Sequence, residues 1–175
     1  RGRFSRWALD GFLGSYRLVT RRDRLPTATA PRQVSESDVR ARDYGLRLTG
    51  VTAVRGVRVE GGLDLAGRFD LQALGSVTRY DPQGRTAGIE EETSIANAAR
   101  RDLGLYASFD GRLRSRLLAS GGMRFDTVAA SNRGGHFGDR DASHTALSGF
   151  LALTAGPLFG ATATGQVARG FRDPT

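Results

Sequence analysis

Apolar and polar residues alternate in several segments of this chain, and the pattern indicates β-strands with two different faces. The segment 57–69 shows it most clearly. One of its faces carries Val57, Val59, Leu63, Leu65 and Phe69, and the other carries Arg58, Glu60, Asp64 and Arg68. Successive side chains of a strand point to opposite sides of the sheet. Four charges would be very costly in a dry protein core, so we expect the charged face to be in contact with water.

The stretch 103–126 has the same alternation twice and predicts a hairpin. Leu105 and Phe109 share one face of its first half, and Met123 and Phe125 share one face of its second half. Between the two halves stands Asp110-Gly111, a dipeptide that is typical of tight hairpin turns. The sequence therefore predicts the turn at 110–111.

Across the whole chain the pattern predicts seven strands of about 10–13 residues. Their connections alternate between long and short, with long loops at 23–42, 70–101 and 128–143 and short turns at 55–56, 110–114 and 156–158. Within the second long loop, Ile95–Ala99 is expected to form a brief helical turn. Strict alternation of loop length is unusual in soluble β-sandwiches, but it is the rule in transmembrane β-barrels.

The predicted fold is therefore all-β: an antiparallel up-and-down meander of about seven strands that is part of a large transmembrane β-barrel. Strands of this length suit a tilted crossing of a bilayer. Seven strands cannot stand alone in lipid, because an open sheet would leave unpaired backbone groups in hydrocarbon. We thus expect residues 1–175 to be an interior piece of a barrel domain.

Composition narrows the functional classes. The 26 Lys and Arg exceed the 18 Asp and Glu, for a net charge of +8, but the arginines are dispersed rather than clustered, which argues against a nucleic-acid partner. With 24 of 175 residues, glycine is about twice as common as usual. The chain has no cysteine, so it offers no thiolate nucleophile or metal ligand. It also lacks a run of about 18 apolar residues that would indicate a transmembrane helix.

Candidate chemical sites are few. His136 and His144 flank two aspartates in the third long loop, but their spacing fits no compact metal-ligand pattern. The acidic run 90–92 could attract a cation, although a solvated loop explains it better. With two histidines and no serine, histidine and acid arrangement, catalysis is not expected. We predict no enzyme activity, no cofactor and no metal site.

Three segments resemble the barrel domain of TonB-dependent outer-membrane receptors. They are 101–107 (Arg-Asp-Leu-Gly-Leu-Tyr-Ala), 121–126 (Gly-Gly-Met-Arg-Phe-Asp) and 165–174, which ends in Phe-Arg-Asp-Pro. The resemblance covers most of the chain from about residue 43 onward. It implies a large barrel in the bacterial outer membrane, filled by an N-terminal plug domain. Such receptors import scarce nutrients, such as iron-siderophores or cobalamin, with energy passed on by TonB. The plug domain and the C-terminal strands are absent from these 175 residues.

This resemblance implies that the partners are outer-membrane lipid, the protein's own plug domain, the TonB complex through that plug, and the nutrient. In a plugged barrel the charged strand face lines the lumen, where its members pair with one another, with the plug or with ligand. The residues expected to face the lumen are Arg58, Glu60, Asp64, Arg68, Arg116, Arg124 and Asp126.

Two other hypotheses remain open from the sequence. One is a passive porin-like or structural outer-membrane barrel. The other is a soluble β-rich binding module, which predicts that Leu63, Leu65, Leu151 and Leu153 are buried against a second sheet.

Overall fold

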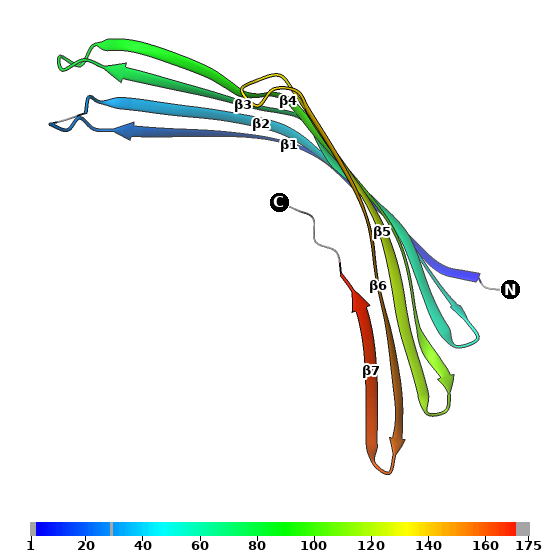
Figure 1. Cartoon of the computed structure of the whole chain (residues 1–175). Helices are drawn as coiled ribbons and strands as arrows, with labels where there is room; N and C mark the ends of the chain where they lie inside the picture. The colour runs from blue at the N-terminus through cyan, green and yellow to red at the C-terminus, as the bar shows by residue number, and fades with distance from the viewer. Residues whose placement is uncertain (1–2, 29, 171–175) are drawn as a thin grey trace.

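The computed structural model describes residues 3–28 and 30–170, and these form a single seven-stranded sheet (Figure 1). Each strand pairs antiparallel with the next one in the chain, in the order β1 to β7. The strands are β1 (Arg3–Arg24), β2 (Gln33–Val54), β3 (Val57–Tyr80), β4 (Thr86–Arg114), β5 (Leu117–Arg133), β6 (Arg140–Leu158) and β7 (Ala161–Arg169). The predicted all-β meander of seven strands is confirmed. No helix among the described residues is long and apolar enough to cross a membrane.

Strands β1 to β6 are longer than the pattern predicts, from 17 residues in β5 to 29 in β4, whereas β7 has 9 described residues. The three long loops therefore shrink to 25–32, 81–85 and 134–139, although their alternation with two-residue turns remains. The residue pattern misses these strand extensions for a physical reason. In the extensions polar and charged residues stand on both faces among scattered apolar ones such as Val34 and Ala41, so the alternation disappears. Cross-strand ion pairs such as Arg17 with Asp38 and Arg21 with Glu36 connect the strands there.

Three local predictions are wrong. Ile95–Ala99 is not a helical turn but part of β4, because Ile95 pairs with Ala73 of β3 and Asn97 pairs with Arg133 of β5. Pairing on both sides satisfies the backbone of this segment as a strand.

The predicted turn at Asp110-Gly111 is also wrong, since both residues lie within β4 and the chain reverses at Ser115-Arg116. A Cβ at Gly111 would lie 2.7 Å from Cα of Val57. Glycine is therefore needed here for the close approach of β3, and the turn follows from the sheet register. In the same way the predicted turn at Gly156-Pro157 lies inside β6, and the reversal is at Phe159-Gly160.

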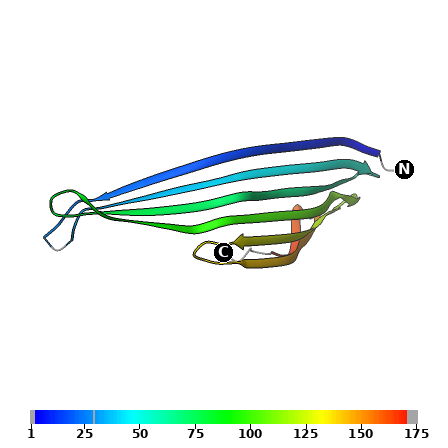
Figure 2. The same ribbon diagram turned by 90° about the horizontal axis from the view of Figure 1, so that it is seen from above.

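The sheet is bent and twisted (Figures 1 and 2), and β1–β4 run on together past the loop that joins β5 to β6. Its two faces differ sharply in the part where β2–β5 pair. One row across the sheet, in direct register, consists of Leu9, Leu48, Leu63, Leu105, Phe125 and Leu147. We call this side the apolar face and the opposite side the polar face.

Along β4 the apolar face is the more exposed of the two. Leu103, Leu105 and Phe109 are 38%, 47% and 37% exposed, whereas Tyr106 and Ser108 on the polar face are partly buried. A water-soluble sheet shows the reverse order, because its apolar side packs on a core. Core residues are correspondingly scarce among the described positions, and the buried apolar ones are Val34, Ala41 and Ala119.

Candidate functional site: a charged network on the polar face

Four charged side chains of the polar face form one connected group across β2, β3 and β5, which we call the polar network: Arg47, Asp64, Arg124 and Asp126. Nε of Arg47 donates to Oδ1 of Asp64 at 2.6 Å, and Nη1 of Arg124 donates to Oδ2 of Asp64 at 2.7 Å. Nε of Arg124 also donates to Oδ1 of Asp126 at 2.8 Å. Asp64 thus joins two guanidinium groups, and its side chain is only 17% exposed.

Glycine at position 104 allows Arg124 to reach across β4. In the register Gly104 stands between Asp64 of β3 and Asp126 of β5. A Cβ at this position would lie 2.1 Å from Nη2 of Arg124. The guanidinium group therefore lies over the bare backbone of β4, and this is how residues 60 positions apart in the sequence form an ion pair.

Tyr106 adds an aromatic ring to the network. Its hydroxyl is 3.0 Å from Oγ1 of Thr49, and the guanidinium carbon of Arg124 is 5.9 Å from its ring centroid. The ring lies over Gly62, where a Cβ would be 2.6 Å from Cζ of Tyr106. A cation near an aromatic face contributes about 0.5–1 kcal/mol at exposed sites, so this contact supports the position of Arg124.

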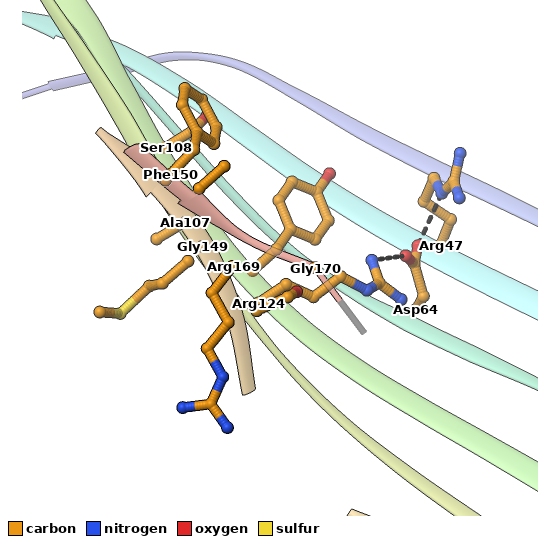
Figure 3. A pocket seen from close by; sticks show the side chains of 14 residues that line it. Arg47, Asp64, Ala107, Ser108, Arg124, Gly149, Phe150, Arg169 and Gly170 are labelled. Carbon is orange, nitrogen blue, oxygen red and sulfur yellow. Dashed lines mark hydrogen bonds and ion pairs between the residues drawn. The ribbon is translucent and has the colours of Figure 1, made fainter. Parts of the chain in front are cut away.

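A hollow of about 520 Å³ opens beside the network (Figure 3). Asp64, Arg124 and Ser108 contribute to its lining, with Phe150 of β6 on another side. Figure 3 shows Arg47 and Arg124 converging on Asp64. The site therefore combines guanidinium and carboxylate groups with an aromatic wall, and it can hold oxygen-bearing groups by hydrogen bonds and ion pairs.

The other charged residues predicted from the sequence are distributed over three places. Arg68 makes a two-pronged contact with Asp43, with Nε to Oδ1 at 2.7 Å and Nη2 to Oδ2 at 3.0 Å, and its guanidinium carbon is 5.2 Å from the ring centroid of Tyr16. Arg58 pairs with Glu60 at 2.8 Å.

Arg116 is separate from both groups, because it lies in the turn between β4 and β5 rather than on a strand face. The carbonyl oxygen of Arg116 accepts a hydrogen bond from the backbone N–H of Gly156.

Sequence reasoning missed Arg47, Asp43, Thr49, Tyr16 and Tyr106 as members of these groups. The alternation does place Arg47 and Thr49 on the other face of the strand from Leu46 and Leu48. The register between strands decides which residues meet across them, and the pattern of a single strand does not give that register.

The histidine cluster does not form a metal site in the part of the chain that the structure describes. Nδ1 of His136 is 2.7 Å from Oε1 of Glu92, and Asp141 is engaged by Arg133. Asp139 accepts the backbone N–H of Gly134. The acidic run 90–92 lies on β4, where Glu90 forms an ion pair with Arg79.

We expect the charge of Asp64 to matter for stability as well as for binding. Replacement Asp64→Asn removes the carboxylate that joins Arg47 and Arg124, so Arg47 loses the counter-charge that it contacts at 2.6 Å and Arg124 keeps only Asp126. The expected loss is about 1–2 kcal/mol of unfolding free energy, measured by urea unfolding of the protein in detergent micelles. The matched control is Glu60→Gln, which breaks a more exposed pair with Arg58 and should cost at most about 0.5 kcal/mol. Equal losses in both variants would contradict the special role of Asp64.

No family model matches the sequence, and no curated protein matches it. Among solved structures, OprC, a TonB-dependent copper transporter, superimposes on 95% of this chain with a TM-score of 0.59 and 13% sequence identity. The fold is that of part of the OprC barrel. The chain spans about a third of the length of OprC, 32%.

The match to OprC confirms, at the level of the fold, the resemblance to part of a TonB-dependent receptor barrel. The Phe-Arg-Asp-Pro motif of the resemblance begins at Phe171 and lies outside the described residues. At 13% identity the likeness to OprC carries no residue roles over to this chain.

Proposed function

We propose that this chain forms part of the wall of an outer-membrane β-barrel that imports a scarce nutrient with energy supplied through TonB. The carrying observation is a one-layer sheet with exposed leucines and phenylalanines on one face and charges that pair with one another on the opposite face. In a barrel the apolar face would meet lipid, and the polar face would line a water-filled or plugged lumen.

The dimensions of the apolar face support a membrane crossing. From Val57 to Phe69, β3 presents alternate residues without a charge on this face. Twelve residue steps of about 3.3 Å give about 40 Å along the strand, and a tilt of about 45° reduces this to about 28 Å. The apolar band of outer-membrane barrels is about 25 Å tall, so the two heights agree.

The soluble alternative fares less well. It predicts a second sheet over Leu63, Leu65, Leu151 and Leu153. Leu63 and Leu65 are partly buried, but Leu151 and Leu153 are each 45% exposed, and the described strands form one layer. Arg169 at the end of β7 is an exception on the apolar face, since it pairs with Gly149 in the same row as Met123. It is the last residue of the last described strand.

In this proposal the lumen side carries Arg58, Glu60, Asp64, Arg68, Arg124 and Asp126, which would contact one another, the plug or the nutrient. We propose no catalytic step. An iron-siderophore or cobalamin remains a candidate nutrient, and OprC adds copper to the candidates.

A growth experiment tests this function. A strain that lacks the gene is expected to grow poorly when one nutrient (iron-siderophore, cobalamin or copper) is supplied at limiting concentration, and the gene should restore growth only when TonB is present. Restoration without TonB would favour the passive porin-like barrel. Recovery of the full-length protein from the aqueous fraction without detergent would contradict any membrane barrel.

A further inference from the structure

Four arginines gather on the apolar face at the level where its apolar rows end, and we call them the arginine patch: Arg17, Arg40, Arg42 and Arg101. Arg101 follows directly after the apolar row that holds Leu103, and it shares a row with Tyr44 through Gly67. The row beyond pairs Arg42 with Phe69, and the next row pairs Arg17 with Arg40.

The patch is compact. Its residues occupy three consecutive rows on β1, β2 and β4. Neighbouring strands are about 4.8 Å apart, and residues two positions apart along a strand are about 6.6 Å apart. The four Cα atoms therefore fit within about 15 Å in each direction, which the long arginine side chains can span.

The positive charge of the patch is only partly neutralised. Arg17 and Arg40 both bind the carboxylate of Asp38, at 2.6 Å and 2.8 Å. Arg42 lies 3.3 Å from Asp70 in a pair that is more than half exposed. Arg101 is exposed and has no ion pair or hydrogen bond to the described residues. Four guanidinium groups thus face two carboxylates, and the net charge is +2.

Aromatic residues share two of the three rows of the patch, with Tyr44 in the row of Arg101 and Phe69 in the row of Arg42. Tyr44 and Phe69 stand with ring centroids 6.1 Å apart, and the guanidinium carbon of Arg42 is 5.9 Å from the Phe69 centroid. Aromatic side chains collect where hydrocarbon meets the headgroup region of a membrane. In a membrane, arginines in the same rows as these rings would lie close to the lipid phosphates.

We propose that the arginine patch binds the phosphate of an anionic lipid headgroup in the membrane leaflet at the long-loop end of the barrel. Guanidinium groups bind phosphate oxygens in pairs of parallel hydrogen bonds, and basic clusters next to a membrane surface select anionic lipids. The inference rests on the proposed membrane location, and it adds a specific lipid contact to the outer wall.

The test uses the purified full-length protein in dodecyl maltoside micelles, with bound lipid counted by native mass spectrometry. The probe is dioleoyl phosphatidic acid, and dioleoyl phosphatidylcholine is the zwitterionic comparison. The double variant Arg42→Gln/Arg101→Gln should weaken binding of phosphatidic acid roughly tenfold or more, because it removes two of the four guanidinium groups that can donate charged hydrogen bonds to the phosphate. Binding of phosphatidylcholine should not change.

The matched control is Arg22→Gln/Arg24→Gln, which removes the same charge from exposed positions on the opposite face of β1. It should bind phosphatidic acid like the unchanged protein. Wild-type affinity in the patch variant, or an equal loss in both variants, would overturn the proposal. Displacement of the lipid by millimolar inorganic phosphate would show a general anion site and would overturn the lipid assignment.

Heat-dependent gel mobility of each variant checks that the barrel is folded. Failure of the inference can be told from failure of the proposed function, because nutrient uptake and membrane location are measured on the unchanged protein. A protein that sits in the membrane and imports nutrient, but whose patch variant binds phosphatidic acid normally, would refute the lipid site alone.

Discussion

Replacement of Leu147 by arginine is expected to destabilise the protein in lipid vesicles by about 2–4 kcal/mol, the cost of arginine near the midplane of a bilayer. Leu147 lies on the apolar face of β6, is 53% exposed and pairs with Phe125 in the row of leucines. In water the same change would cost little, because the side chain is already exposed. The measurement is urea unfolding of the full-length protein folded into phosphatidylcholine vesicles.

Ala146 provides the control on the same strand. Its side chain points to the polar face, next to Asp126 of β5. The variant Ala146→Arg carries the same added charge at the same depth but should change the unfolding free energy by less than about 1 kcal/mol, as expected for a partly solvated ion pair. If Leu147→Arg were as harmless as Ala146→Arg, the apolar face would not meet lipid.

The second large effect is expected at Gly62. A Cβ at this position would lie 2.5 Å from the carbonyl oxygen of Leu48 and 2.6 Å from the Tyr106 ring. The backbone oxygen cannot move as a flexible side chain does, so Gly62→Ala must shift β2 or β3 and displace Tyr106 from Thr49. Overpacking of this kind costs about 1–3 kcal/mol.

Gly165→Ala is the matched control, because nothing lies within 4 Å of a Cβ at that position in β7. We expect it to be neutral or slightly stabilising, since glycine is a poor strand residue. Both variants can be compared by urea unfolding in detergent micelles. A neutral Gly62→Ala would show that the close packing of Tyr106 over β3 is not needed.

The alternation of residues predicts the fold class and the strand order because both depend on one repeated property, the two faces of each strand. The seven strands of the meander and the turn at Arg55-Gly56 follow from it directly. Strand ends do not. In the extensions of β1–β4 polar residues stand on both faces and apolar ones are scattered, so residues such as 33–42 look like loop although they pair on two sides.

The polar network could be predicted only in part. The sequence places Asp64, Arg124 and Asp126 on charged faces but does not say that they meet. That contact depends on Gly104, which lets Arg124 cross β4, and on the register that aligns Gly104 with Asp64 and Asp126. The displaced turn at Asp110-Gly111 has the same origin, because pairing with β3 and β5 outweighs local turn preference.

The bare backbone at Gly104 has a further consequence for assembly. A slip of one residue between strands exchanges the two faces, and the apolar rows would oppose it. A slip of two residues leaves every side chain on its own face, so the apolar rows discriminate against it weakly. It would, however, place Asp102 or Tyr106 under Arg124 in place of glycine. The network therefore favours the correct register of β4 over registers shifted by two residues in either direction.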